Sequence, residues 1–423
     1  MKMKLSEIAF YVEERVNSDT ISLEEYVTTD CILQNKRGRE CATNLPPQSC
    51  SLVCYKKGDV LVANIRPYLK KIWYADIDGA ASSDVLVFRA KDGHSSEFLF
   101  ATLLQDSFYD YVMQGAKGSK MPRGDKEQIM RYEMPTLSIA EESIGKFIMD
   151  INRKIRLNEQ INQNLEAMAK QLYDYWFVQF DFPNEDGKPY KSSGGEMVWN
   201  EKLKREIPKG WNVLKLGEHC SFNKRTSNGY FNHPILYLDT SNITNNTIDE
   251  LQFLNPSSDI IPSRARRLVQ EGDIVYSTVR PNLKHFGIIM NPDYNMVVST
   301  GFAVITANWS AYRYFIYQFL TQAATVENLS TIAQSAVSAY PSINTSDIEN
   351  LDLVVPPDSM IEKYAKTACR LYLQIDTNYK EIKSLTKQRD ELLPLLMNGQ
   401  VSVNSDLSVF YIVIFKYYAS SVN

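Results

Sequence analysis

Basic side chains gather in two separate stretches of the chain, and their chemistry suits contacts with a polyanion. Lys and Arg neutralise phosphates, while Arg, Lys, Asn, Gln, Ser and Thr can read base edges. In the first stretch the candidate nucleic-acid contacts are Arg66, Lys70, Lys71, Lys117, Lys120 and Arg123. In the second stretch they are Arg264, Arg266, Arg267, Arg280 and Lys284. Any one of them could equally be a solvated surface charge, so the hypothesis depends on how the fold groups them.

Residues that could form a catalytic or metal site are few and poorly spaced. Asp186 and Lys188, with Asp174 or Asp181 upstream, faintly match the carboxylate-x-Lys pattern of a metal-dependent nuclease, but no strand pattern flanks them. The sequence has no Gly-rich phosphate loop, no Cys-x-x-Cys pair and no Pro-Pro motif of an amino-methyltransferase, and its four histidines are scattered. We therefore predict a chain that is not an enzyme and binds no metal or cofactor itself.

The amino-acid composition is compatible with a nucleic-acid-binding protein that is not an enzyme, but it does not by itself indicate one. The chain has 423 residues, 44% of them hydrophobic and 23% charged, which suits two or three globular domains. The net charge is −4, so a nucleic-acid surface would have to be local or shared with partners. No apolar run reaches the roughly 20 residues of a membrane helix. Six cysteines without an even ladder of spacings favour reduced thiols and a cytoplasmic location.

An internal duplication organises the chain. Lys4-Leu5-Ser6-Glu7 matches 215–218, and Gly58-Asp59-Val60 followed by 65–70 matches 272–274 followed by 279–284. Further matches occur in chain order, and the separation between partners grows slowly, as small loop insertions would produce. A period this long indicates two equivalent domains about a pseudo-two-fold axis rather than a solenoid. Arg66 and Arg280 fall at equivalent positions.

Each repeat combines short strands with helices and then continues into a long helix of a different period. The strands are predicted at 59–63, 85–88, 273–277 and 302–305, and helices at 97–114 and 312–328. The long helices carry apolar residues at alternating spacings of three and four, which is typical of a coiled-coil seam. The seam residues include Ile151, Ile155, Asn158, Leu165, Leu371, Ile375, Asn378 and Leu385. Matching seam Asn residues favour packing of the two helices on each other, antiparallel if the halves obey a two-fold, although they could merely cover separate cores.

The predicted fold class is therefore α+β, with two similar mixed domains joined by two long antiparallel helices. The predicted segments are a first mixed domain (1–145), a central helix (146–180), a Pro/Gly linker (181–210), a second mixed domain (211–357), a C-terminal helix (358–398) and a tail (399–423). The apolar run 409–415 within the tail looks like a single strand, too short to span a bilayer.

The order of mixed domain, long helix, mixed domain and long helix resembles the specificity subunit of type I restriction–modification enzymes. The two Gly-Asp-(Val/Ile) strands that lead to Arg-Pro look like the repeated signature of that family. The stretch 154–177 resembles its central helical region, and the phrases at 181–190 and 207–211 are also typical. The resemblance covers about residues 1–400. The apolar tail and the two Asn residues on the seam of the first helix depart from the family pattern.

The resemblance implies that each mixed domain is a target-recognition domain that reads one half of a bipartite site in double-stranded DNA. It implies that the helices set the gap between the half-sites and bind two modification subunits, which use S-adenosylmethionine to methylate adenine. Restriction subunits with ATP- and Mg²⁺-dependent translocase and nuclease activity would join them. Two alternatives stay open: a nuclease built around Asp186 and Lys188, and a scaffold whose coiled coil only joins partner proteins.

Overall fold

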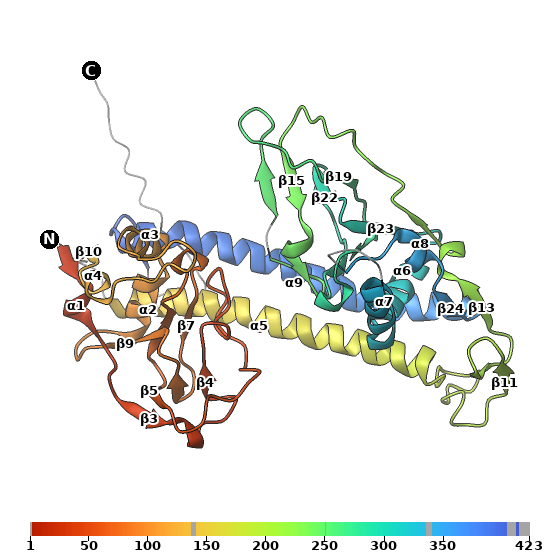
Figure 1. The fold of residues 1–423 in the computed structure, drawn as a ribbon, viewed down its shortest axis with the longest axis horizontal. Helices are drawn as coiled ribbons and strands as arrows, with labels where there is room; N and C mark the ends of the chain where they lie inside the picture. Colours follow the sequence, from red (N-terminus) through yellow and green to blue (C-terminus); the bar gives the residue numbers. More distant parts are fainter. Residues whose placement is uncertain (1, 137–140, 250, 336–340, 404–411, 414–423) are drawn as a thin grey trace. The chain divides into compact units, whose positions relative to one another are not determined.

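The structure is a computed structural model that describes residues 2–136, 141–249, 251–335, 341–403 and 412–413. It divides into two compact units. Unit 1 comprises Met1–Asn158 and Glu381–Asn423, and unit 2 comprises Glu159–Lys380. The long helices α5 (Glu141–Tyr173) and α9 (Asp358–Met397), yellow and blue in Figure 1, contribute one segment each to both units. Each unit is thus a mixed domain together with one segment of each long helix.

Mixed domain 1, in unit 1, contains two four-stranded sheets, β2-β9-β6-β7 and β3-β5-β8-β4, and the ladder β1-β10. Its strands are β1 (Lys2–Lys4), β2 (Ala9–Tyr11), β3 (Arg15–Asn17), β4 (Tyr26–Val27), β5 (Ser51–Tyr55), β6 (Val60–Ala63), β7 (Ile72–Tyr74), β8 (Gly79–Ala81), β9 (Val85–Ala90) and β10 (Glu133–Pro135). Because β6 lies between β9 and β7 and both its faces are covered, all four of its residues are buried.

Mixed domain 2, in unit 2, contains the sheets β14-β23-β20-β21 and β18-β15-β22-β19 and the ladders β13-β24 and β16-β17. Its strands are β13 (Asn212–Lys215), β14 (Cys220–Phe222), β15 (Ile235–Leu238), β16 (Ile243–Thr244), β17 (Thr247–Ile248), β18 (Gln252–Leu254), β19 (Ala265–Leu268), β20 (Ile274–Ser277), β21 (Phe286–Ile288), β22 (Met296–Ser299), β23 (Phe302–Ala307) and β24 (Asp352–Val355). The strands predicted at 59–63, 85–88, 273–277 and 302–305 correspond to β6, β9, β20 and β23.

The two mixed domains share strand pairing down to the register. Val60 pairs with Phe88 in the first, and Ile274 with Ile305 in the second, at the positions that the sequence repeat equates. Each domain also has one parallel pair, β4 with β8 and β15 with β22. The second sheets differ at one edge, because β18 extends the second sheet beyond β15 and, among the described residues, no strand lies beyond the equivalent β4 in the first. At the other edge, the pairing of β3 with β5 is matched by the bridge between Thr226 and Arg267. The duplicated domains therefore keep one framework and vary its border.

Short helices cover the sheets. Each of the two helices predicted from the sequence is divided into two shorter helices. The region 97–114 forms α2 (Ser96–Leu104) and α3 (Asp106–Gln114), and the region 312–328 forms α6 (Tyr312–Thr321) and α7 (Ala323–Ser335). The break falls at Gln105 and Gln322, whose ψ angles of 143° and 140° are extended rather than helical. The remaining short helices are α1 (Leu5–Ile8), α4 (Lys126–Ile129) and α8 (Thr345–Glu349).

The stretch 181–210 is more ordered than its Pro and Gly content predicts. The hairpin β11 (Met197–Asn200) and β12 (Arg205–Pro208) lies within it. Phe182 stacks on Tyr190 and on Trp211, with ring centroids 4.6 Å and 5.0 Å away, so aromatic packing fixes this stretch on the core of unit 2. Within the tail, β25 (Ser402–Val403) pairs with β26 (Ile412–Val413). The rest of the predicted strand at 409–415 lies outside the described residues.

Candidate nucleic-acid interface

The Gly-Asp signature forms the same turn in both mixed domains. Gly58 and Gly272 have φ angles of +92° and +82°, a conformation that favours glycine. Asp59 and Asp273 are 2% and 0% exposed, and each carboxylate accepts the backbone N–H three residues before it at 2.8 Å. These acids therefore close a turn within the fold and are not available to a ligand.

Each buried carboxylate is neutralised by an arginine, which comes from β9 in mixed domain 1 and from the segment after β14 in mixed domain 2. Arg89 on β9 donates two hydrogen bonds of 2.7 Å to Asp59. Asp273 instead accepts 2.5 Å and 2.7 Å hydrogen bonds from Arg225 and from the Thr306 hydroxyl. Thr306 occupies on β23 the place of Arg89 on β9, because the sequence repeat equates their strand partners. Both domains thus keep an Asp–Arg ion pair at this turn, although the arginine occupies different positions in the two repeats.

The Arg-Pro motif that follows has an unusual backbone in both domains. The segments 66–70 and 280–284, here called the signature turns, are short 3₁₀ turns that begin and end in left-handed residues. Their φ angles are 52° and 50° for Arg66 and Lys70, and 49° and 56° for Arg280 and Lys284. The two Arg side chains are exposed. Left-handed non-glycine residues at four matching places indicate that the surrounding fold imposes this shape.

Lys70 and Lys71, predicted as DNA contacts, are engaged within unit 1. Lys70 Nζ lies 2.8 Å from the carboxylate of Asp106, the first residue of α3. Lys71 Nζ donates to the carbonyl of Thr29 at 2.6 Å, and burial lowers the pKa of its ammonium group. Lys71 is therefore better suited to a structural role than to a phosphate contact.

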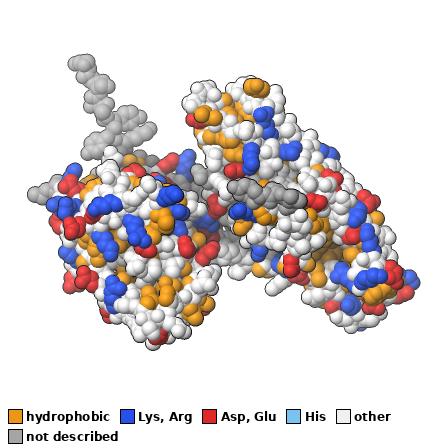
Figure 2. All heavy atoms as spheres, in the orientation of Figure 1, with side chains coloured by type: hydrophobic (Ala, Val, Ile, Leu, Met, Phe, Trp, Pro, Cys, Tyr) orange, Lys and Arg blue, Asp and Glu red, His pale blue; other side chains and the backbone are white. Residues whose placement is uncertain are grey.

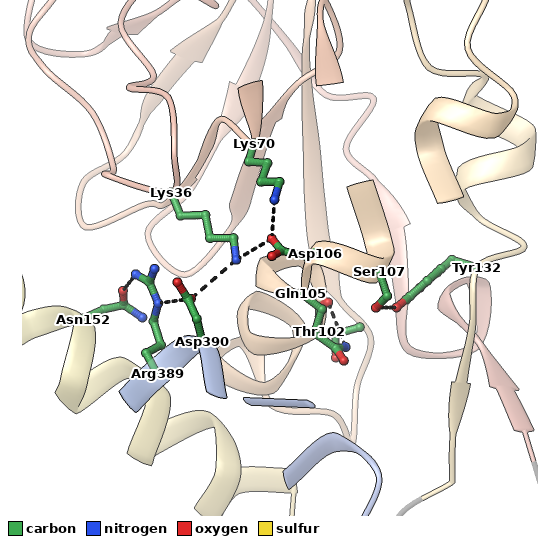
Figure 3. Close-up of polar contacts among 10 residues, drawn as sticks. All are labelled: Lys36, Lys70, Thr102, Gln105, Asp106, Ser107, Tyr132, Asn152, Arg389 and Asp390. Carbon is green, nitrogen blue, oxygen red and sulfur yellow. Dashed lines mark hydrogen bonds and ion pairs between the residues drawn. The ribbon is translucent and has the colours of Figure 1, made fainter. Parts of the chain in front are cut away.

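Figure 3 shows a polar network that links the first signature turn to the long helices. Asp106 also accepts from Lys36 at 2.8 Å, and Lys36 lies 3.5 Å from Asp390 of α9. Although burial acts to raise it, the hydrogen bonds from both lysines hold the pKa of Asp106 below its usual range. Arg389, beside Asp390, donates to Asn152 of α5 at 2.9 Å. Sequence reasoning missed Lys36, whose only local signal is its place in a polar turn.

The loop 115–123 presents basic side chains on the surface of mixed domain 1. Lys117, Lys120 and Arg123 are all exposed. Two of them have acidic neighbours: Lys117 lies 3.3 Å from Asp125, and Arg123 lies 3.0 Å from Asp84. Such exposed ion pairs are weak and can be exchanged for a phosphate at little cost.

The basic cluster 264–267 of mixed domain 2 splits into exposed and packed members. Arg264, just before β19, is exposed. Arg266 is half-buried and donates to the carbonyl of Ser263 at 3.0 Å. Arg267 donates to the Thr226 hydroxyl at 3.3 Å, and burial lowers the pKa of its guanidinium group. Arg280, Gln334 and Pro341 line the same pocket, and Lys284 is exposed. On the face drawn in Figure 2, basic side chains are interspersed with acidic ones in each unit.

The predicted seam residues lie where α5 and α9 pack together within each unit. Ile151, Ile155, Asn158, Ile375 and Asn378 are between 2% and 7% exposed. Leu165, Leu371 and Leu385 are partly buried against the same cores. Tyr372, absent from the prediction, is more deeply buried than Leu371, at 1% exposed.

Polar contacts between α5 and α9 show whether their segments run parallel or antiparallel in each unit. Asn152 bonds to Arg389 and Asn158 to Glu381 in unit 1, while Asn162 bonds to Asn378 and Glu166 to Tyr372 in unit 2. Residue numbers rise on one helix as they fall on the other, so the segments are antiparallel in each unit.

The residues considered for a nuclease or metal site do not converge. Asp186 and Lys188 are exposed in a turn whose backbone N–H groups both donate to the Asn184 side chain. The Asp181 carboxylate instead accepts hydrogen bonds from the backbone N–H and the hydroxyl of Ser192. Within the described ranges no three His, Cys, Asp or Glu side chains are placed to hold a metal ion. Among the same residues no helix is long and apolar enough to cross a membrane.

The sequence is similar to a known protein family and to individual characterised relatives. The family model "Type I restriction modification DNA specificity domain" matches residues 208–387. The type I restriction enzyme MjaIX specificity subunit of Methanocaldococcus jannaschii is 27% identical over 379 residues, which cover 87% of this chain and 83% of that protein. The HindI specificity subunit of Haemophilus influenzae is 22% identical over 465 residues, covering 94% and 98%.

The fold is also similar to a solved structure. The crystal structure of a type I restriction–modification S subunit from M. genitalium aligns with a TM-score of 0.54 at 14% identity and covers 93% of this chain and 94% of that one.

Proposed function

This chain belongs to the type I restriction–modification DNA specificity subunits, and on that premise we propose that its two mixed domains read the two halves of a bipartite DNA site. A subunit of this family is non-catalytic and binds no cofactor. Its work is recognition, so its chemistry consists of phosphate and base contacts.

The observation that carries the proposal is the pair of mixed domains with one register and different borders. Both second sheets have a segment paired at one edge, as β3 on β5 in mixed domain 1 and as the bridge between Thr226 and Arg267 in mixed domain 2. In the part of the chain that the structure describes, only mixed domain 2 adds a strand, β18, at the other edge. A shared framework lets both domains approach DNA in the same way, whereas different borders let each recognise a different sequence. A protein that only joined partners would have no need for this divergence.

We assign the signature turns to phosphate contacts and the non-equivalent basic residues to base readout. Arg66 and Arg280 are exposed at matching positions, which suits a contact that is independent of sequence. Lys120 and Arg264 are exposed in parts that differ between the domains, so they are candidates for base edges. Further phosphate contacts would come from Lys117, Arg123 and Lys284. The proposed DNA-binding surface would be stabilised through contacts inside each domain by Lys70, Lys71, Arg266 and Arg267.

The proposed partners supply all of the catalysis. Two modification subunits would bind the paired helices and use S-adenosylmethionine to methylate adenine. Restriction subunits would add ATP- and Mg²⁺-dependent translocation and cleavage. The proposed location is cytoplasmic, because six cysteines without an even ladder of spacings favour a reducing compartment.

The test is to purify the chain with modification subunits, supply S-adenosylmethionine and map methylated adenines on random-sequence DNA. The proposal predicts one recurring split sequence with a fixed gap. Methylation without a bipartite pattern would contradict it. Metal-dependent cleavage by the chain alone, lost in Lys188→Ala, would support the nuclease alternative instead.

A further inference from the structure

Each mixed domain carries one short hairpin whose two tip residues are both left-handed. We call these hairpins, 33–38 in mixed domain 1 and 243–248 in mixed domain 2, the anchor hairpins. The tip φ angles are 59° and 62° for Asn35 and Lys36, and 45° and 65° for Asn245 and Asn246. Two consecutive residues of positive φ form the tightest hairpin turn, in which Asn is one of the few favoured side chains.

Both tips are bonded to the signature turns. The backbone N–H groups of Asn35 and Lys36 donate to the carbonyls of Leu69 and Lys70, each at 2.9 Å. In mixed domain 2, the N–H of Asn245 donates to the carbonyl of Lys284 at 3.0 Å. Anything that moves an anchor hairpin therefore moves the proposed phosphate-binding turn of the same domain.

In unit 1 the anchor hairpin also contacts both long helices. Lys36, whose side chain is only 6% exposed, lies 3.5 Å from Asp390 of α9. At Gly38, a Cβ atom would lie 2.7 Å from the guanidinium of Arg156 on α5. The absence of a side chain at Gly38 thus permits the hairpin to approach α5 closely.

In unit 2 the equivalent tip contacts the helices through different chemistry. Asn246, which is 8% exposed, donates from Nδ2 to Glu166 of α5 at 2.5 Å. Its carbonyl accepts from the Tyr379 hydroxyl of α9 at 3.3 Å, and that hydroxyl also lies 3.1 Å from the Thr247 hydroxyl. Each anchor hairpin therefore makes directional polar contacts to α5 or α9 and to its own signature turn.

From these contacts we propose that Lys36 and Asn246 are positioning residues that fix the orientation of each recognition domain on its own helix segments and so determine which gap between half-sites is accepted. Apolar packing tolerates small rotations, whereas hydrogen bonds and ion pairs depend steeply on distance and angle. This inference rests on the proposed function, because a gap has meaning only for a bipartite site.

Two variants loosen the anchors without leaving a buried charge alone. In Lys36→Met, Asp106 keeps Lys70 as a partner and Asp390 keeps Arg389. Tyr379→Phe removes one hydroxyl from the anchor of unit 2. Lys57→Met is the matched control, because Lys57 is an exposed lysine of mixed domain 1 outside the anchor hairpin.

The experiment measures methylation, by the complex with modification subunits, of a DNA library that joins both half-sites by gaps one or two base pairs shorter or longer than the preferred one. Each anchor variant should raise relative methylation at the neighbouring gaps by about tenfold, which corresponds to about 1.4 kcal/mol of lost orientation preference. The half-site bases should stay the same, and Lys57→Met should match the wild type.

The outcomes separate the two claims. If the wild type shows no bipartite site, the proposed function fails and the inference falls with it. If the wild type is bipartite but both variants keep its gap profile, the inference alone is overturned. Hydrogen exchange at the amides of Asn35 and Lys36 should rise in Lys36→Met. Faster exchange with an unchanged gap profile would assign the anchor to stability only.

Discussion

Asn378 of α9 donates a 2.8 Å hydrogen bond to the side-chain oxygen of Asn162 on α5, and the two residues are only 5% and 4% exposed. Asn162 in turn donates to the carbonyl of Ile375 at 3.4 Å. A buried amide pair of this kind stabilises only one alignment of the two helices, because any slip leaves both groups unsatisfied.

Asn378→Leu should therefore destabilise unit 2 by about 1–3 kcal/mol, since it leaves the oxygen of Asn162 buried without its donor. The double variant Asn162→Leu, Asn378→Leu should recover most of that loss, because no unpaired polar group remains. Urea unfolding followed by circular dichroism measures both effects. Gln163→Leu, at an exposed position of α5, is the control. A double variant as unstable as the single one would contradict this account of the pair.

The exchange of arginines around the buried Gly-Asp carboxylates makes a second prediction. Arg89→Thr should destabilise unit 1 by about 3 kcal/mol, because it leaves the buried Asp59 charge without a partner. Glu14 and Arg225 occupy equivalent places, since their carbonyls accept matching bonds from Cys54 and Leu268.

Adding Glu14→Arg to Arg89→Thr copies the arrangement of mixed domain 2 and should restore at least half of the lost stability. Thermal unfolding compares the single and double variants. No recovery in the double variant would show that the two charge pairs are not interchangeable.

Glu166 makes the stability of unit 2 depend on pH. Burial raises the pKa of this carboxyl from 4.5 to about 7, although hydrogen bonds from Asn246 and Tyr372 oppose the shift. Because the folded pKa is the higher one, the stabilisation is complete below pH 4.5 and is lost as the pH rises towards 7. The shift corresponds to on the order of 3 kcal/mol.

Glu166→Gln should remove this dependence and make the protein more stable than the wild type at pH 8. Denaturant titrations at pH 5 and pH 8 measure the difference. Glu327→Gln, on the exposed surface of α7, should leave the slope unchanged. A wild type whose stability rises between these pH values relative to Glu166→Gln would refute the assignment.

Arg264, assigned above to a base edge, should contribute one base contact to DNA binding. Arg264→Ala should weaken binding to the specific site by about 1–3 kcal/mol and leave the salt dependence of log K unchanged, because no phosphate contact is lost. Fluorescence anisotropy over a salt series measures both. Lys188→Ala removes the same charge from an exposed turn outside the mixed domains and should have no effect. Equal behaviour of the two variants would remove Arg264 from the interface.

The sequence repeat was sufficient to predict the framework but not the contacts that fix it. Matched motifs located the equivalent turns at Arg66 and Arg280, and the seam spacing located Asn158 and Asn378. The spacing could not show that Asn378 faces Asn162 while Asn158 faces Glu381, because a heptad pattern fixes a face and not the alignment of the facing helix. Lys36 was missed because its role depends on Asp390, a residue far away in the chain.

The breaks at Gln105 and Gln322 were missed for another reason. Apolar residues continue through both positions, so periodicity alone predicts one helix where the backbone makes a corner. The ordered stretch 181–210 was missed because stacking of Phe182 on Trp211 outweighs the local effect of Pro and Gly.

The central claim is that each mixed domain reads its own half-site. Its most direct test is to exchange residues 1–145 for the corresponding domain of another family member and to map the methylated sites. The account predicts that one half-site changes, while the other half-site and the gap stay as they were. A change in both half-sites, or in neither, would contradict it.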